Sequence, residues 1–367
     1  MKKEKIRALF PITKDTVYLN NASQSPLNTL VKEKLNIYFE KETSFVGKKG
    51  FDRNTVRVPL SKLLGGLPEE YALTTSTGVG IGIIAKGINF KRGDNIILPE
   101  REHWNNSFPW LQLEEKGVEI RFIKLKVDNS FDTEAIEKLI DNNTRVVAVA
   151  AVRYNSGFRP NLAAISKIAH KKNALFVVDA AQGAGMIPVD VEKDGIDIMA
   201  GCGFKWLLGL DGTGYLYVSK RVVKMINPVL PGMFSAERDD DELTFYKDSR
   251  KFETGTMAYS LFDAWSAGLQ LLLDIGIENI YKKALENTDI IIEGLLEKGY
   301  TIISPINHRS ERSAIVHFKT STFETTNTLF EKLKNNKVLV TLQGKNIRVS
   351  PNFFTSKEEI NIFLNLV

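Results

Sequence analysis

Short apolar runs alternate with helical patterns between about residues 70 and 220. The candidate strands are rich in β-branched and aromatic residues and cover 71–75, 95–98, 119–123, 146–150, 175–179, 196–200 and 214–218. Segments with apolar residues at helical spacing lie between them, among them 78–87, 105–116 and 162–172. This alternation predicts a mostly parallel α/β sheet covered by helices on both faces.

The pattern changes after Gly255. A long helix is predicted from Ser260 to about Lys283, and a second one over 289–298. Strand-like runs at 314–318, 339–341 and 347–349 follow, and a closing helix begins at Lys357. We therefore predict two domains, a large one over 15–257 and a smaller α+β domain over 258–367 that includes the N-terminal arm 1–14.

Composition and charge narrow the function classes. The chain has 367 residues, of which 43% are hydrophobic and 25% charged, as is typical of a globular protein with a large core. Its net charge of +5 is scattered through helices that also carry acids, so no nucleic-acid partner is expected. A single cysteine and four widely spaced histidines argue against a disulfide and against a metal site. No apolar stretch has the length of a membrane span, so we expect a cytoplasmic protein with no membrane partner.

A glycine-rich turn, Thr74-Thr-Ser-Thr-Gly-Val-Gly-Ile-Gly82, joins the first candidate strand to a helix. Free N–H groups at a helix start bind phosphate. Gly78 and Gly80 also fit a dinucleotide-binding motif, but Ile83 takes the place of its third glycine. The hydroxyl-rich start of the turn favours a monophosphate, and a merely tight strand–helix turn is the structural alternative.

A lysine and an acid suggest the cofactor that this phosphate site would serve. Lys205 lies in an apolar, glycine-flanked turn, and Asp179 ends a strongly apolar strand. Lysines usually face solvent and acids often cap helices, but Phe204 and Trp206 make full exposure of Lys205 unfavourable. Pyridoxal phosphate (PLP) requires an amine for its Schiff base and a carboxylate on its pyridine nitrogen. The pair therefore predicts an enzyme of amino acids.

Three further side chains fit such a site. His103 follows a strand end, where its ring can stack on a planar cofactor or act as a structural hydrogen-bonding group. Gln182 lies three residues after Asp179 and can donate to the phenolic oxygen of the cofactor ring. Arg348 has a planar guanidinium group that can bind a substrate carboxylate at two points. The alternative interpretation of Arg348 is a surface salt bridge.

Ordered motifs run along nearly the whole chain. They are Tyr18-Leu-Asn-Asn-Ala-Ser23, 74–82, Glu100-Arg-Glu-His103, Tyr154-Asn-Ser-Gly157, Asp179-Ala-Ala-Gln182, Phe204-Lys-Trp-Leu-Leu-Gly209, 212–218, Phe252-Glu-Thr-Gly-Thr256 and Ile347-Arg-Val-Ser350. In this order they resemble the class V aminotransferases of PLP fold type I, the group with cysteine desulfurases, selenocysteine lyases, kynureninase and isopenicillin N epimerase-like proteins. The resemblance implies a large domain with a mostly parallel seven-stranded sheet and a smaller α+β C-terminal domain.

The resemblance also implies roles in cofactor binding. Lys205 would form the Schiff base and carry the proton between the substrate and the cofactor. Asp179 would pair with the pyridine nitrogen, Gln182 would bind the phenolic oxygen, and His103 would stack on the ring. The phosphate would be held at the start of the helix by Thr77, Gly78 and Val79.

Other residues are implied to bind substrate or a second subunit. Arg348 would bind the substrate carboxylate, and Asn155 would lie near the substrate and the phenolic oxygen. Asn21 begins a segment expected to form a wall of the substrate site. Thr256 would reach the phosphate in the neighbouring subunit, which implies a homodimer with shared active sites.

Two departures from the family pattern narrow the activity. Many members have a serine or threonine three residues before the lysine and a histidine directly before it. Here Cys202 and Phe204 occupy those positions, so phosphate binding is expected to depend more on Thr77 and Thr256. Cysteine desulfurases also need a mobile cysteine in the small domain, and residues 257–367 contain none. A persulfide-forming desulfurase is therefore disfavoured.

We predict a PLP-dependent enzyme that acts on an amino acid, with transamination against a keto acid as the first hypothesis. A cysteine or selenocysteine β-lyase without a small-domain cysteine is the alternative. Two hypotheses of other classes stay open: a nicotinamide-dependent oxidoreductase and a non-catalytic PLP-fold binding protein. Tyr154, Trp206 and Phe353 are expected to narrow the site toward small or apolar side chains.

Overall fold

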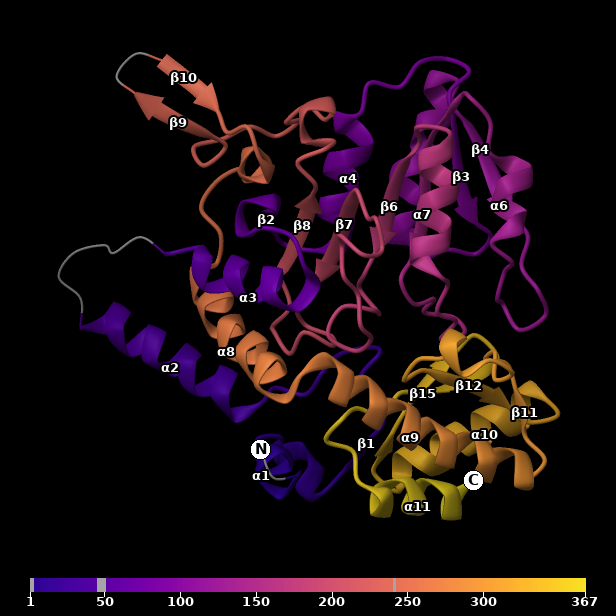
Figure 1. Ribbon diagram of the computed structural model, residues 1–367. Coiled ribbons are helices and arrows are strands. Elements are labelled where there is room, and N and C mark those ends of the chain that lie inside the picture. The colour runs from indigo at the N-terminus through magenta and orange to yellow at the C-terminus, as the bar shows by residue number, and fades with distance from the viewer. Residues whose placement is uncertain (1–2, 45–50, 240–241) are drawn as a thin grey trace.

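A seven-stranded sheet organises the first two-thirds of the chain (Figure 1). The computed structural model describes residues 3–44, 51–239 and 242–367. In spatial order the strands are β2 (Tyr71–Thr74), β8 (Gly214–Val218), β7 (Ile198–Cys202), β6 (Leu175–Asp179), β5 (Thr144–Ala150), β3 (Asn95–Pro99) and β4 (Glu119–Ile123). Only β8 runs antiparallel to its neighbours, which confirms the predicted mostly parallel sheet.

Helices cover both faces of this sheet because successive strand residues point to opposite sides. Val146 and Ala148 of β5 pack into one core, whereas Val147 and Val149 pack into the other. The first face carries α4 (Thr77–Gly87) and α5 (Phe108–Leu111), and the second carries α3 (Asn54–Leu64), α6 (Glu134–Leu139) and α7 (Leu162–Lys171). The predicted helices 78–87 and 162–172 are confirmed to within one residue.

The prediction of one continuous helix over 105–116 is wrong. Only the four residues of α5 are α-helical, and short 3-10 turns flank them. Pro109 has no N–H to donate, so a helix that started before it would lose a hydrogen bond there. Gly117 ends the segment in the left-handed conformation.

A four-stranded antiparallel sheet forms the C-terminal part of the molecule. Its strands are, in spatial order, β11 (Thr301–Ile302), β12 (Val316–Lys319), β15 (Asn346–Val349) and β14 (Thr341–Gln343). The short β1 (Val17–Tyr18) pairs in parallel with β13 (Val338–Leu339). Helices α10 (Phe323–Asn335) and α11 (Lys357–Leu366) pack on a third core that also contains Leu19.

The N-terminal residues lie against this C-terminal core. Arg7 of α1 (Lys3–Ala8) pairs with Glu359 of α11 at 2.5 Å. Residues 17–19, which the predicted division assigns to the large domain, pack with the C-terminal strands. Residues 1–2 of the predicted arm lie outside the described residues. The domain boundaries themselves stay a prediction.

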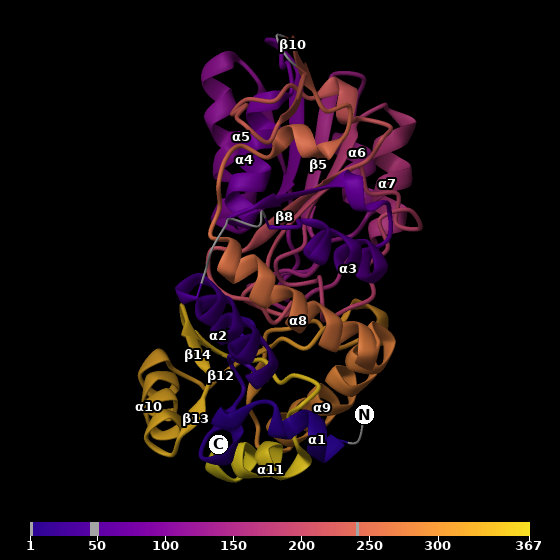
Figure 2. The same ribbon diagram turned by 90° about the vertical axis from the view of Figure 1, so that its left-hand side faces the viewer.

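Long helices connect the two parts of the molecule. Helix α2 (Thr29–Thr43) lies along α8 (Tyr259–Ile275), as Figure 2 shows. A hairpin of β9 (Ala236–Asp239) and β10 (Glu242–Phe245) projects from the end of the molecule that lies away from the C-terminal sheet (Figure 1). None of the helices in the described ranges combines the length and the apolar character that a membrane crossing requires.

The long helix predicted from residue 260 to about 283 is two helices. Helix α8 ends at Gly276, and α9 (Ile277–Glu297) begins directly after it and takes in the segment predicted as a separate helix over 289–298. Gly276 has φ +85° and ψ 130°, a conformation that side chains with a Cβ rarely adopt. A single glycine inside an apolar pattern does not reveal such a break, because helices also tolerate glycine.

Substituting Gly276 by alanine is expected to destabilise the protein by about 1–3 kcal/mol, since the positive φ would strain the added Cβ. Gly82 is the matched control, because it lies inside α4 and a Cβ there would meet no atom within 4 Å. Gly82→Ala is expected to stabilise the protein by about 0.5–1 kcal/mol. Urea denaturation of both variants measures the difference, and equal midpoints would contradict the proposed break.

Candidate active site

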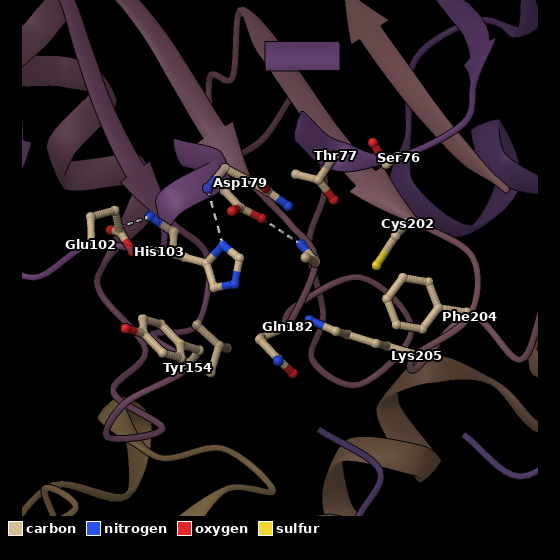
Figure 3. Close-up of a pocket in the computed structure, with 14 residues that line it drawn as sticks. Ser76, Thr77, Glu102, His103, Tyr154, Asp179, Gln182, Cys202, Phe204 and Lys205 are labelled. Atoms are coloured by element: carbon tan, nitrogen blue, oxygen red, sulfur yellow. Dashed lines mark hydrogen bonds between the residues drawn. The ribbon is translucent and has the colours of Figure 1, made fainter. Parts of the chain in front are cut away.

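A small pocket opens at the carboxyl ends of the central strands (Figure 3). In parallel sheets ligands bind at this edge. Its walls come from segments that directly follow or end β2, β3, β5, β6 and β7. The side chains that face it include Ser76, Thr77, Glu102, His103, Tyr154, Asp179, Gln182, Cys202, Phe204 and Lys205. The sequence-predicted Thr77, His103, Asp179, Gln182 and Lys205 are thus brought together.

Lys205 is carried by a rigid loop after β7. The N–H of Gly209 donates to the Gly203 carbonyl at 2.8 Å, and the Trp265 indole donates to the Leu207 carbonyl at 3.0 Å. Leu208 adopts a left-handed conformation with φ +60°. The Lys205 ammonium makes no hydrogen bond or ion pair with any described residue, and Figure 3 shows it pointing across the pocket. The loop therefore presents a lysine that is available to react.

Asp179 ends β6 and is only 4% exposed. One of its oxygens accepts the N–H of Ala181 at 2.9 Å. Burial raises the pKa of Asp179, and the positive charge of Lys205 opposes that increase. Within the part of the chain that the structure describes, Asp179 forms no ion pair. A buried carboxylate of this kind is stabilised by a cationic ligand in the pocket.

His103 lies on the opposite wall. Its Nδ1 accepts the backbone N–H of Asn105 at 3.2 Å, so in the neutral ring the proton is on Nε2. The ring packs edge-on against Tyr154, with 5.0 Å between the ring centroids. Burial and the nearby Lys205 charge lower the pKa of His103. The side chain is therefore a neutral, flat wall of the pocket at pH 7.

The N-terminus of α4 forms the end of the pocket. The N–H groups of Thr77 and Gly78 have no acceptor within the helix, as is general for the first helical turn. A Cβ at Gly78 would lie 3.0 Å from Oδ1 of Asn105, so glycine allows this close packing. The N–H of Val79 already donates to Oγ of Ser76 at 3.2 Å, and its predicted contact with phosphate requires that bond to open.

Gln182 is fixed between two partners. The Trp206 indole, which can only donate, contacts Oε1 of Gln182 at 2.7 Å, so the amide oxygen must face it. Nε2 of Gln182 donates to the Ala22 carbonyl at 2.8 Å and keeps one further N–H for a ligand. Trp206 therefore lies behind the pocket wall, and Phe353 is also absent from the lining. Of the three aromatic residues expected to narrow the site, only Tyr154 lines it.

Six predicted site residues lie outside the pocket lining: Gly78 and Val79, described above, and the four that follow. The side-chain amide of Asn155 donates to the Arg101 carbonyl at 3.1 Å, and its buried Oδ1 has no partner. Asn21 is fully buried and donates to the Ser350 carbonyl at 2.9 Å. Thr256 is exposed in the loop before α8. Arg348 donates to Oγ of Ser23 at 2.6 Å from β15. The substrate and subunit roles of these residues stay predictions.

Arg348 nevertheless has one hydrogen-bond donor without a partner. It is 6% exposed, and its Nε has no hydrogen-bond partner. Burial lowers its pKa to about 10, so the guanidinium stays charged at neutral pH. His317 faces Arg348 across the β12–β15 pair and donates from Nε2 to the Tyr154 carbonyl at 3.1 Å. Burial and the Arg348 charge lower the pKa of His317 to about 3.

Cys202 and Phe204, the two departures from the family pattern, both line the pocket. Burial raises the pKa of the Cys202 thiol, while Lys205 and a hydrogen bond with Thr77 oppose that increase. A buried thiol with a raised pKa is a poor nucleophile. Cys202 is therefore a wall residue next to Thr77.

Sequence reasoning missed an ion pair beneath His103. Glu102 and Arg153 lie 3.3 Å apart, and both side chains are about 1% exposed. Charged residues three positions after the end of a buried strand, Glu102 after β3 and Arg153 after β5, were the available signal.

The residues of the pocket fit PLP. The carboxylate of Asp179 suits the pyridine nitrogen, the start of α4 suits the phosphate, and the unpaired Lys205 suits the aldehyde. Among the described residues no three His, Cys, Asp or Glu side chains come close enough together to hold a metal ion.

Comparison with known proteins decides the family. The family model "Aminotransferase class-V" matches residues 17–351. The chain belongs to this family. Two curated relatives are a probable cysteine desulfurase of Methanothermobacter thermautotrophicus, 32% identical over 79% of this chain and 74% of the relative, and an uncharacterized aminotransferase of Bacillus subtilis, 28% identical over 97% and 95%.

Solved structures have the same fold. The apo cysteine desulfurase of Thermococcus onnurineus NA1 matches with a TM-score of 0.90 and 25% identity over 99% of this chain and 96% of that one. A C-DES mutant with glycine covalently linked to PLP has a TM-score of 0.90 at 22% identity, over 98% of both chains, and supports the fold. The chain is therefore a PLP-dependent enzyme of the class V aminotransferase family, and a nicotinamide-dependent oxidoreductase is not supported.

His317 is expected to make stability depend on pH. Its folded pKa of about 3 lies below the value of about 6.5 in the unfolded chain. Between these values only the unfolded chain binds the proton, so stability falls as the pH is lowered from about 6.5. From pH 7.5 to 5.0 this contribution is about 2 kcal/mol. His317→Gln should therefore lose about 2 kcal/mol less than the wild type, as measured by urea denaturation at both pH values. Equal losses would refute the burial effect.

Proposed function

We propose that this enzyme transaminates an amino acid with a small, uncharged side chain. The observation that supports this best is the pair of unpaired opposite charges, Lys205 and Asp179, in one pocket at the strand ends. Each of them lacks an ion-pair partner among the described residues, and both face the same space (Figure 3). An amine and an acid in this arrangement fit the two ends of the PLP ring system.

The walls would hold the cofactor in one orientation. Asp179 would keep a proton on the pyridine nitrogen, and the neutral His103 would lie flat against the ring. The remaining N–H of Gln182 would donate to the phenolic oxygen. The phosphate would lie at the start of α4, against Thr77, Gly78 and Val79. When bound, PLP supplies an electron-accepting ring that makes the α-hydrogen of an amino acid acidic.

Lys205 would then move the proton. Its Nζ lies on a rigid loop without a hydrogen-bond or ion-pair partner among the described residues. In its neutral form the amine would take the α-hydrogen as a proton and return it at a neighbouring carbon. The rigidity of the 203–209 loop matters, because proton transfer requires the amine within hydrogen-bond distance of the reacting atom.

Arg348 and Asn155 would bind the substrate. The free Nε of Arg348 and the free Oδ1 of Asn155 are buried polar atoms without partners. A guanidinium pairs with a carboxylate at two points. Tyr154, His103 and Phe204 line the pocket, and among its described lining residues Lys205 is the only one that is cationic at pH 7. These features support a small, uncharged substrate side chain.

A β-lyase is the second candidate. It is favoured by relatives named cysteine desulfurase and by the cystine C–S lyase C-DES, whose structure in complex with cysteine persulfide matches with a TM-score of 0.89 at 22% identity. A route through a persulfide on an enzyme cysteine of the small domain is opposed because residues 257–367 contain no cysteine. We also propose a homodimer in which Thr256 completes the neighbouring phosphate site, and a cytoplasmic location.

The first measurement adds L-amino acids one at a time to the PLP-loaded protein and follows the visible absorption. In a transaminase the absorption is lost stably and returns when a keto acid is added. Recovery without a keto acid, together with released ammonia or sulfide, would refute transamination and support the lyase. Keto acids of different size then identify the second substrate.

Lys205→Ala is expected to lose the visible absorption of bound PLP and to lower turnover by at least about 10³-fold, since it removes both the amine and the proton carrier. Lys86→Ala is the control, because Lys86 is exposed on α4 and carries the same charge. Wild-type turnover in Lys205→Ala would rule out the assigned role.

Arg348→Ala is expected to raise KM for amino acids about 10- to 100-fold with a smaller change in kcat, because one charge-assisted contact with the carboxylate is lost. Steady-state kinetics with the amino acid that the first measurement identifies provide the test. An unchanged KM would place the carboxylate site elsewhere.

A further inference from the structure

Behind the His103 wall lies a group of contacts that the cofactor roles do not use. We infer that Glu102 and Arg153 form a positioning clamp. The clamp holds the loop that carries His103 and the loop that carries Asn155 in the relative positions that the pocket requires. The clamp consists of these two side chains and their hydrogen bonds to the backbone of residues 100–103 and 150. Neither residue is proposed to touch substrate, and both would act through their neighbours.

Glu102 faces the pocket, but both of its oxygens are engaged. Oε1 accepts the backbone N–H of His103 at 2.9 Å, and Oε2 accepts the N–H of Ala150 at 3.3 Å. The carboxylate thus ties the end of β5 to the residue that forms the wall over the cofactor. Because its lone pairs point at these groups, it is not arranged as a proton donor.

Arg153 holds the same loop from the other side. Its Nη1 contacts Glu102 at 3.3 Å, and Nη2 donates to the carbonyls of Glu100 at 2.8 Å and Arg101 at 3.2 Å. The Arg101 carbonyl also accepts the amide of Asn155 at 3.1 Å. Arg101 has φ +51°, a left-handed conformation that costs energy in a residue with a side chain. The turn therefore needs external contacts to keep this conformation.

The burial of the pair points to a geometric role. A buried ion pair contributes little net stability compared with apolar residues of the same size, because both charges lose their hydration. This pair nevertheless lies at about 1% exposure directly beneath the pocket. Its contacts are with the backbone of residues 100, 101, 103 and 150, and a shift there would move the ring and the Asn155 amide together.

This inference rests on the proposed roles of His103 and Asn155. The experiment therefore measures PLP binding by spectroscopic titration and the circular dichroism of the bound cofactor, in addition to kinetics. Arg153→Lys keeps the charge opposite Glu102 but lacks the second arm of the guanidinium. It is expected to bind PLP about tenfold more weakly, as is typical when the supports of a binding residue are lost. kcat/KM should fall about 100-fold.

The double variant Glu102→Leu with Arg153→Met separates positioning from folding. Because both charges are removed together, no buried charge is left unpaired and the variant is expected to fold, with a melting temperature lowered only by the lost backbone hydrogen bonds. Weak PLP binding and an altered dichroism band in this stable protein would support the clamp. Wild-type PLP affinity, dichroism and kinetics in both variants would overturn it.

Arg121→Lys is the matched control. Like Arg153, Arg121 belongs to the region of the large sheet and bonds a backbone carbonyl and carboxylates. Its partners are the carbonyl of Leu139 and the carboxylates of Asp141 and Glu119. It lies on the edge strand β4, away from the pocket. Wild-type PLP binding is expected there, and a loss equal to that of Arg153→Lys would overturn the clamp as a local device. A wild-type protein that binds no PLP would instead refute the proposed function.

Discussion

The structure depends on one electrostatic constraint, the burial of the Asp179 carboxylate at the end of a strand inside an otherwise apolar sheet. Its neighbours Val177 and Val178 pack into the two cores, so the carboxylate is placed in the pocket by the rigid strand that carries it. Desolvation makes the bare anion unfavourable, as its raised pKa shows. In the proposed site a cationic ring nitrogen would relieve this cost, which would couple the stability of the sheet edge to cofactor binding.

The sheet and the centre of the site were predictable because they follow local patterns. Alternating strands and helices mark the parallel sheet, and the carboxyl ends of its strands bring Thr77, His103 and Asp179 together. The break at Gly276 and the irregular segment near Pro109 were not predictable, since single glycines and prolines have several outcomes. The clamp of Glu102 and Arg153 was missed because it depends on which loops meet, and the spacing along the chain does not show this.

The two departures from the family pattern both lie in the wall of the pocket. Cys202 and Phe204 replace polar residues beside the lysine, and both turn their side chains toward the pocket. The lining near Lys205 is therefore less polar than the family pattern implies, and fewer side chains there can hold a phosphate. In the proposed site the start of α4 would carry a larger share of that task. The same change leaves the lysine next to an aromatic ring, 5.6 Å from its centroid.

The parallel pairing of β1 with β13 has a consequence for how the protein is made. Asn21, next to β1, bonds Ser350 across 329 positions of the chain, and Leu19 is part of the C-terminal core. Contacts between such distant positions form slowly. During synthesis residues 17–19 leave the ribosome long before residues 338–350, so they have no partner until that later segment emerges. The C-terminal core therefore closes only then, and a chaperone that shields the apolar segment at 17–19 would act until that point.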